Sequence, residues 1–320
     1  MKSRKRIVQK GILNHCYQRT AEGVVIFYCI SDYLVWFTTF CVTAVKHRVT
    51  VLSVAMMPDH LHQSVVADSR RELSAFIGEV TSRFSVAHNG TCHYTGALFE
   101  HPYGSAPKYG DKKARTNLIY VGNNPVERRL CRFAEEYRWN FLAYAESPHP
   151  FSEPLVVRKA SPQMKRAIRE VRAQHAARRP MVYGQLKRLF SSLQDSEKEQ
   201  LVDLIVSTYN VIDYGAATRY FDSYQDMLTA MHASTGSEYD LNEVFVGKSD
   251  ACYDEMTAVL LKELGLYDIH EVLGWNMDER AKLIGILQRW TNALPEQIAA
   301  FLRIPFRREL TGQQVCFVSD

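Results

Sequence analysis

In the first half of the chain, apolar residues alternate with polar ones or run together in short stretches, and this pattern predicts β-strands. Residues 11–30 predict a strand, a turn and a second extended piece. Residues 49–56 are β-branched and apolar, which is typical of a buried strand, and residues 60–66 predict another strand. Pro58 and Asp59 form a turn signal between these two strands, so a β-hairpin is expected.

Two stretches between the predicted strands have apolar residues at the three- and four-residue spacing of a helix face. The first is expected to begin at Ser31-Asp32, whose short polar side chains can accept hydrogen bonds from free backbone N–H groups, and to end near Lys46. The second follows the cap residue Ser69 and is expected to end near residues 89–90, an Asn-Gly pair.

The rest of the first half predicts a short strand at residues 98–99 and a loop over residues 101–110, which contain two Pro and two Gly. A final helix begins near Lys112 and is expected to end just before Pro125, because proline disfavours helix at the residue that precedes it. The order β-α-β-β-α-β plus a terminal helix predicts an α+β fold. We expect a ferredoxin-like antiparallel sheet with helices on one face.

The second half predicts helices. A Pro-rich connector at residues 147–154 suggests three regions: a first domain over residues 1–150, a basic linker or helix over 151–180, and a mostly helical domain over 181–320. The candidate helices of the last region are residues 185–192, 196–209, 223–233, 252–264, 268–273 and 278–290.

Composition indicates a globular protein, with 46% hydrophobic and 23% charged residues. The net charge of +4 permits a nucleic-acid partner without requiring one. No stretch approaches about 18 uncharged apolar residues, so no membrane span or membrane partner is expected. The seven cysteines are scattered and form no C-x-x-C pair, a usage typical of the reducing cytoplasm.

The clearest candidate chemistry lies in the predicted hairpin, at His60-Leu61-His62. Alternate side chains of a strand point to the same face, so the two imidazoles would lie side by side. Paired neutral imidazoles form half of a site for a divalent metal. The alternative is that the triplet is incidental, unless another segment supplies a third ligand.

The predicted helix before Pro125 carries Tyr120, and Asn124 follows four residues later on the same side. Basic residues flank this tyrosine at Lys112, Lys113, Arg115, Arg128 and Arg129. A phenol among cations beside a metal site is a candidate nucleophile, because positive charge favours the phenolate. The alternative is an ordinary amphipathic helix with a solvated basic face.

Two motifs together resemble a known family. Met57-Pro58-Asp59-His60-Leu61-His62, and the later stretch from Leu118 to Val126 that contains Tyr120 and Asn124-Pro125, resemble the single-tyrosine HUH transposases, most closely the REP-associated tyrosine transposases. The resemblance covers about residues 7–150 and implies the same β-α-β-β-α-β core.

The resemblance implies that His60 and His62 bind Mg²⁺ or Mn²⁺, that Asn124 offers a third ligand, and that Tyr120 is the nucleophile. The implied reaction cuts and rejoins single-stranded DNA next to a hairpin through a 5′-phosphotyrosine. The flanking basic residues would hold the phosphate backbone. Two alternatives stay open: a domesticated relative that binds hairpin DNA or RNA without cutting it, and a DNA-binding regulator.

The resemblance assigns nothing to the second half, where two features suggest duplex DNA as a further partner. Residues 157–180 are rich in Arg and Lys, which indicates either a DNA-binding helix or a solvated linker. Residues 295–305 predict the first helix and turn of a helix-turn-helix near 285–312, with Arg307 and Arg308 on a second helix as candidate DNA contacts. The expected location is the cytoplasm at the nucleoid, as a monomer or homodimer.

Overall fold

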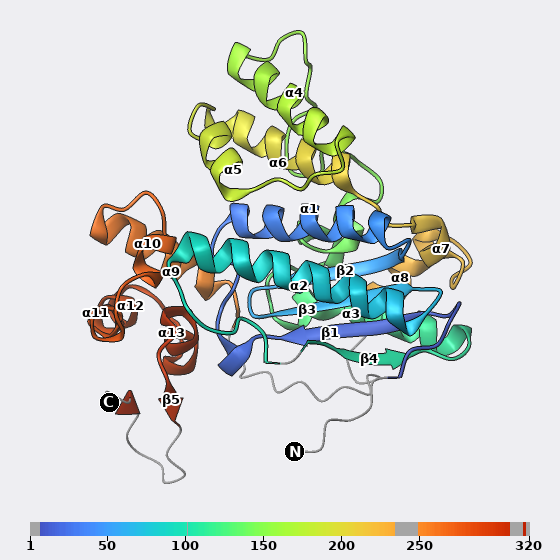
Figure 1. The fold of residues 1–320 in the computed structure, drawn as a ribbon, viewed down its shortest axis with the longest axis horizontal. Coiled ribbons are helices and arrows are strands. Elements are labelled where there is room, and N and C mark those ends of the chain that lie inside the picture. Colours follow the sequence, from blue (N-terminus) through green and yellow to red (C-terminus); the bar gives the residue numbers. More distant parts are fainter. Residues whose placement is uncertain (1–6, 101, 234–248, 308–315, 318–320) are drawn as a thin grey trace.

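The computed structural model describes residues 7–100, 102–233, 249–307 and 316–317. It has an α+β architecture, in which a four-stranded antiparallel sheet is surrounded by helices (Figure 1). The strands are β1 (Asn14–Arg19), β2 (Thr50–Met57), β3 (His60–Val66) and β4 (Gly104–Pro107), in the order β2-β3-β1-β4.

The predicted hairpin of β2 and β3 is confirmed, and it places His60 and His62 in the middle of the sheet. β3 pairs with β2 on one side and with β1 on the other, with Ala55 opposite His62 and His62 opposite Tyr17. The turn at Pro58 is fixed by the irregular segment after β1, since the Pro58 carbonyl accepts from the Ile26 N–H at 2.9 Å.

Helices α1 (Ile30–Lys46) and α2 (Arg70–Cys92) cover one face of the sheet, as their spacing predicted. Their apolar side chains form the main core with the strands; its largest buried members include Trp36, Phe40, Phe76 and Phe84. The Ser69 hydroxyl accepts from the Glu72 N–H, as expected of a cap. α2 continues past the predicted Asn-Gly stop to Cys92, and His93 ends it in the left-handed conformation.

The position of the fourth strand differs from the sequence prediction. Residues 98–99 contribute only an isolated bridge between Thr20 and Phe99, whereas β4 lies inside the segment expected to be a loop. β4 is a short edge strand that pairs with β1. Its residues Gly-Ser-Ala-Pro show no strand-like alternation, because backbone pairing with β1, not side-chain burial, determines its position.

Helix α3 (Asp111–Glu127) also departs from the prediction, because it continues through Pro125. A proline removes one intrahelical hydrogen bond. Near this point Asn140 Nδ2 donates to the Gly122 carbonyl at 2.6 Å, so a side chain supplements the helix bonding. The extra turn keeps Asn124 helical, on the same face as Tyr120.

The second half is mostly helical, as expected. Its helices are α4 (Pro162–Ala176), α5 (Tyr183–Phe190), α6 (Asp195–Tyr209), α7 (Tyr214–Thr218), α8 (Tyr224–Ala233), α9 (Cys252–Leu264), α10 (His270–Leu273), α11 (Met277–Ala281), α12 (Ile284–Trp290) and α13 (Pro295–Leu302). Short 3-10 turns η1 (Ala21–Gly23), η2 (Ala134–Glu136) and η3 (Phe141–Tyr144) lie in the first half. The expected helix over residues 278–290 is split into α11 and α12, and α7 was not predicted.

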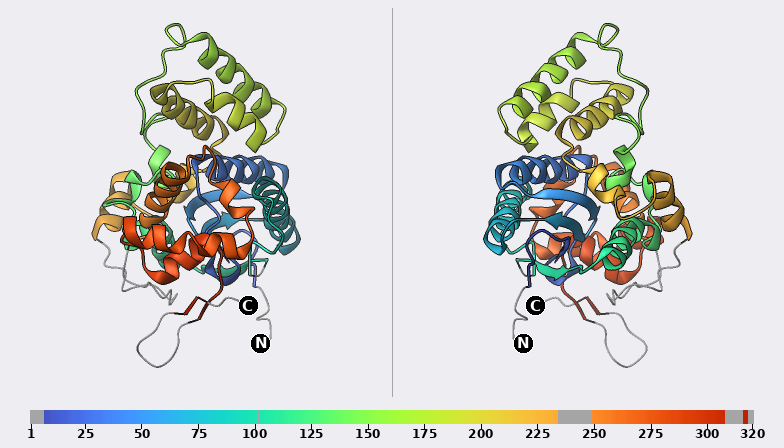
Figure 2. Two further views of the ribbon diagram at one scale, coloured as in Figure 1. Left: turned by 90° about the vertical axis from the view of Figure 1, so that its left-hand side faces the viewer. Right: turned by 90° about the vertical axis from the view of Figure 1, so that its right-hand side faces the viewer.

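The added helices pack on three different parts of the sheet domain (Figure 2). α7 lies against β2, and α8 lies against α3. α6 lies on α1, and α4 lies on α6, so these helices extend the layer on the α1 side. The helices from α9 to α13 form a second core that includes Val25, Tyr28 and Cys92 of the first half.

The predicted second helix of a helix-turn-helix is not found where it was expected to begin. α13 matches the first helix, but Phe306–Arg307 form strand β5, which pairs antiparallel with β6 (Cys316–Phe317). Arg303 leaves the helix in the left-handed conformation, which redirects the chain. Arg308 lies outside the described residues. Within the described ranges, no helix is both long and apolar enough to cross a membrane.

Candidate active site

The residues with candidate chemistry lie on the face of the sheet opposite α1 and α2. Leu61 and Val65 of β3 point into the main core, so the alternating residues His60, His62 and Ser64 point to the other face. Helix α3 crosses this face along β2 and β3. Two independent segments, separated by about sixty residues in the sequence, therefore meet here.

Three residues spaced along α3 each face one of three alternate residues of β3. Asn117 Oδ1 accepts from the Ser64 hydroxyl at 2.8 Å, the Tyr120 ring lies edge-on to His62, and Asn124 contacts His60. Such a match is geometrically natural, since two strand residues advance about 6.6 Å and three to four helix residues about 4.5–6 Å. The helix thus presents tyrosine and asparagine to the two histidines at successive steps.

Tyr120 lies within a cluster of imidazole rings. Its ring centroid is 5.2 Å from that of His62 and 5.7 Å from that of His15. His15 comes from β1, and its Nε2 lies 3.1 Å from His62 Nδ1. The cluster is buried, with Tyr120 only 4% exposed. The phenol is therefore held beside two imidazoles in a site shielded from bulk solvent.

His60 lies between two oxygen atoms. Its Nδ1 is 2.5 Å from Asp59 Oδ1, and its Nε2 is 3.0 Å from Asn124 Oδ1. A neutral imidazole that donates Nδ1–H to Asp59 presents an Nε2 lone pair beside the Asn124 oxygen. A nitrogen lone pair next to an amide oxygen is a donor pair that a divalent cation can use.

Asp250 of the second half reaches the surroundings of His60, where it lies beside Arg128 at the end of α3. Burial raises the pKa of the Asp59 carboxyl, but the contact with His60 and the positive charge of Arg128 outweigh this effect, so that the pKa is lowered overall. Arg128 Nη1 lies 3.8 Å from Asp250 Oδ2. Burial and the nearby Asp59 carboxylate raise the pKa of Asp250 to about 6. A carboxylate from beyond residue 249 thus belongs to the electrostatic environment of the site.

The helix that carries Tyr120 is fixed on both sides. On the sheet side, the small side chain of Ala55 gives room for Tyr120 and Val121. On the other side, Asn123 Nδ2 donates to the Met231 carbonyl of α8 at 2.8 Å. A Cβ on Gly122 would lie 2.7 Å from Met231 Sδ, so the glycine allows α8 to approach closely.

The basic residues predicted to hold DNA have different surroundings. Lys112 and Lys113 are exposed at the start of α3. Arg115 pairs with Asp226 of α8 at 3.1 Å, so it also serves the packing of α3 against α8. Arg129 is exposed just after α3. Of the C-terminal candidates, only the backbone of Arg307 is described, within β5.

Sequence reasoning missed His15 and Tyr17, which lie on the same face of β1 as the histidine pair of β3. The Tyr17 ring is tilted against that of His15, with centroids 5.7 Å apart, and it lies over Gly104, where a Cβ would meet Tyr17 Cζ at 2.1 Å. The alternation of β1 places both side chains on one face. The pairing of β1 with β3 is what brings them to the site, and the residues around His15 and Tyr17 carry no local signal of a functional role.

A second buried polar cluster lies where α1, α2, α5, α10 and α13 meet. Two groups of its side chains bring metal-binding atoms within 4.8 Å of one another: His88, Cys92 and His270, and Cys29, Asp32 and His270.

Contacts within the protein already use the donor atoms of this cluster. Asp32 accepts from Tyr183 Oη at 2.7 Å and from His270 Nε2 at 2.9 Å. Arg303 Nη2 lies 2.7 Å from His88 Nε2, and its positive charge opposes a cation there. This arrangement indicates a structural hydrogen-bond centre that joins the two halves of the chain.

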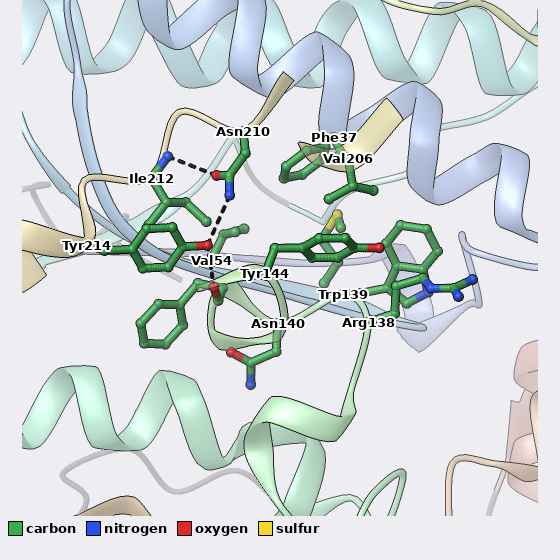
Figure 3. A pocket seen from close by; sticks show the side chains of 12 residues that line it. Phe37, Val54, Arg138, Trp139, Asn140, Tyr144, Val206, Asn210, Ile212 and Tyr214 are labelled. Carbon is green, nitrogen blue, oxygen red and sulfur yellow. Dashed lines mark hydrogen bonds between the residues drawn. The ribbon is translucent and has the colours of Figure 1, made fainter. Parts of the chain in front are cut away.

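Neither of two cavities in the described structure coincides with the histidine–tyrosine cluster. Figure 3 shows a small one between β2, η3 and α6, of about 10 Å³, where Asn210 contacts Tyr214 and the Ile212 N–H. That volume is about one water-sized sphere, so this cavity is a packing gap. A larger cleft of about 1220 Å³ lies between the start of α1 and helices α5, α9 and α10, and its lining includes His270 of the second polar cluster.

No family model matches the sequence, and no curated protein matches it. Among solved structures, one match is a REP-associated tyrosine transposase bound to a REP hairpin. This match covers 44% of the present chain and 82% of the other chain, at 13% identity and a TM-score of 0.38. At this level of similarity, function has to be inferred from the site itself.

Proposed function

We propose that the protein is a single-strand DNA endonuclease and strand transferase of the HUH type, with Tyr120 as its nucleophile. The observation that carries the proposal is the meeting of two motifs: His60 and His62 on one strand face, and Tyr120 and Asn124 on the helix that crosses it. The strand order β2-β3-β1-β4, with α1 and α2 on the opposite face, agrees with the ferredoxin-like core expected for such an enzyme.

The donor set fits a divalent cation. His60 Nε2 and Asn124 Oδ1 face each other at 3.0 Å, and His62 lies beside them on the same strand face. Asp59 on His60 Nδ1 supplies the outer hydrogen bond that commonly orients a metal-binding histidine. A mixed set of imidazole nitrogen and amide oxygen is compatible with Mg²⁺ or Mn²⁺. When bound, the cation would neutralise charge on the phosphate.

The chain's own residues would perform the covalent step. Tyr120 Oη attacks the phosphorus, the new Oη–P bond forms, and the P–O3′ bond breaks, leaving a 5′-phosphotyrosine and a 3′-hydroxyl. The proton released by Tyr120 balances the proton that the 3′-oxygen takes up. Attack by another 3′-hydroxyl reverses the step and joins new strands. Lys112 and Lys113, exposed about two turns before Tyr120, would bind the backbone.

The described arrangement is closed. Tyr120, His60 and His62 are all buried, so a phosphate can reach them only when neighbouring residues move. The proposal therefore includes an opening step that comes before chemistry.

The test is formation of a covalent adduct with labelled single-stranded hairpin DNA in the presence of Mn²⁺ or Mg²⁺, resolved on a denaturing gel. The adduct should be lost with chelator, with Tyr120→Phe and with the double change His60→Ala/His62→Ala. Tyr109→Phe, at an exposed tyrosine shortly before α3, is the matched control and should retain it. Cleavage that persists in Tyr120→Phe would exclude Tyr120 as nucleophile, and hairpin binding without any adduct would favour the non-cleaving alternative.

A further inference from the structure

Helix α4 has a regular basic face that the proposed chemistry does not use. Its buried side, formed by Met164, Ala167, Ile168 and Val171, belongs to the main core. Arg166, Arg169 and Arg172 lie on the other side, and all three are exposed. Three-residue steps place successive arginines about 4.5 Å apart along the helix axis. We call these three residues the basic face.

The basic face lies in a segment where the charge of the protein is concentrated. Residues 158–180 contain eight Lys or Arg against one acidic residue, Glu170, a net charge of +7. Because the whole chain has a net charge of +4, all the rest carries −3. This segment is therefore far more basic than the chain as a whole.

Other parts of the protein do not neutralise the basic face. Glu170, the one acid of the segment, is paired with Arg188 of α5. In the described ranges, no ion pair or side-chain hydrogen bond involves Arg166, Arg169 or Arg172. Arginines that only maintained solubility would need neither this regular spacing nor this lack of ion pairs with the rest of the protein.

The position of the basic face separates it from the candidate active site. α4 packs on α6 and α6 on α1, whereas Tyr120 lies on the opposite face of the sheet (Figure 1). A nucleic acid bound at α4 would therefore be a different segment from the single strand that reaches Tyr120.

We propose that the basic face of α4 binds the phosphate backbone of duplex DNA as a second, sequence-independent DNA site. A row of arginines on one exposed helix face suits a duplex, which presents closely spaced phosphates and releases counterions when these are neutralised. The choice of DNA over another polyanion rests on the proposed function. The site would hold flanking or target duplex while the opposite face acts on a single strand.

The experiment measures binding of the full chain to a blunt, fluorescently labelled DNA duplex without divalent metal, over a series of salt concentrations. The triple change Arg166→Glu/Arg169→Glu/Arg172→Glu should weaken binding by at least about tenfold and reduce the slope of log affinity against log salt by about three. The matched control is Arg48→Glu/Arg70→Glu/Arg71→Glu, which changes the net charge equally at exposed arginines elsewhere. It should bind duplex nearly as the original protein does.

Several results would overturn the inference. Equal losses in both triple variants would show that overall charge, not this face, drives binding. Unchanged duplex binding in the α4 variant, or preference of the original protein for duplex RNA or for anionic phosphatidylglycerol vesicles, would also refute it. Binding is also measured in Tyr120→Phe, so failure of the cleavage proposal remains distinguishable. Retained thermal stability of the α4 variant excludes misfolding as the cause of a loss.

Discussion

Replacing Asp32 by Asn should destabilise the protein strongly, although the side chain keeps its size. Asp32 is fully buried at the start of α1, where Oδ2 accepts from the N–H groups of Tyr28 and Cys29 at 2.8 and 3.0 Å. Oδ1 accepts from Tyr183 Oη and from His270 Nε2. An asparagine has one acceptor oxygen, so its NH₂ group must face donors on one of these two sides.

The expected cost follows from the charge that is lost. Burial raises the pKa of Asp32, but His270 and His88 lower it well below its usual range overall, so the buried group is a carboxylate. Removing one partner of a buried ion pair costs about 3–5 kcal/mol. Because Asp268 also contacts His270, at 2.7 Å, we expect the lower part of that range, about 3 kcal/mol. That loss is a large share of a typical unfolding free energy of about 5–15 kcal/mol.

The assay is urea unfolding followed by circular dichroism at neutral pH, with comparison of the midpoint and the slope. Asp195→Asn, the same chemical change at a fully solvent-exposed carboxylate, is the control and should leave the midpoint unchanged within error. A loss below about 1 kcal/mol for Asp32→Asn would refute the reasoning, because it would mean that the four donors around Asp32 need no negative charge.

Three further predictions concern other parts of the molecule. The pKa of His270 is raised well above its usual value, since Asp32 and Asp268 outweigh the effect of burial. As the pH rises, the unfolded chain therefore loses this proton before the folded protein does, and the free energy of unfolding should fall by up to about 1.4 kcal/mol per pH unit between about pH 7 and 8. Unfolding titrations at several pH values should show that His270→Gln flattens this slope. Gly104→Ala should cost about 1–3 kcal/mol by displacing the Tyr17 ring, and much less in a Tyr17→Ala background; equal costs in both backgrounds would contradict the clash. Asp59→Asn should raise the Mn²⁺ concentration needed for half-maximal adduct formation by about 10–100-fold, whereas an unchanged requirement would mean that Asp59 does not orient His60.

The sequence predicts most of the sheet domain, because its elements carry strong local signals. The alternation of β3 and the apolar run of β2 predict the hairpin, and the helical spacing after Ser31 and Ser69 predicts α1 and α2. β4 was missed because an edge strand of four residues is defined by its partner and not by its own pattern. The continuation of α3 past Pro125 was missed because the local rule ends a helix before a proline, whereas this helix continues to Glu127. The nearby contact of Asn140 with the Gly122 carbonyl comes from another segment, and local rules do not include it.

The candidate site was predictable in part, for the same reason. His60 and His62 follow from strand alternation, and Tyr120 and Asn124 from helical spacing, so each half of the site has a local signal. His15 has none, because its place beside His62 depends on the pairing of β1 with β3. The contribution of Asp250 near Asp59 was likewise beyond prediction, since it requires the second half to fold back onto the first.

The contact of α3 with the strands has a genetic consequence. Tyr120 and Asn124 meet His62 and His60 of the same polypeptide, so each copy carries both halves of the proposed site. A copy with Tyr120→Phe and a copy with His60→Ala should then fail to complement each other when produced together. Each defective copy would remain defective, and only recombination between the two genes would restore a working enzyme.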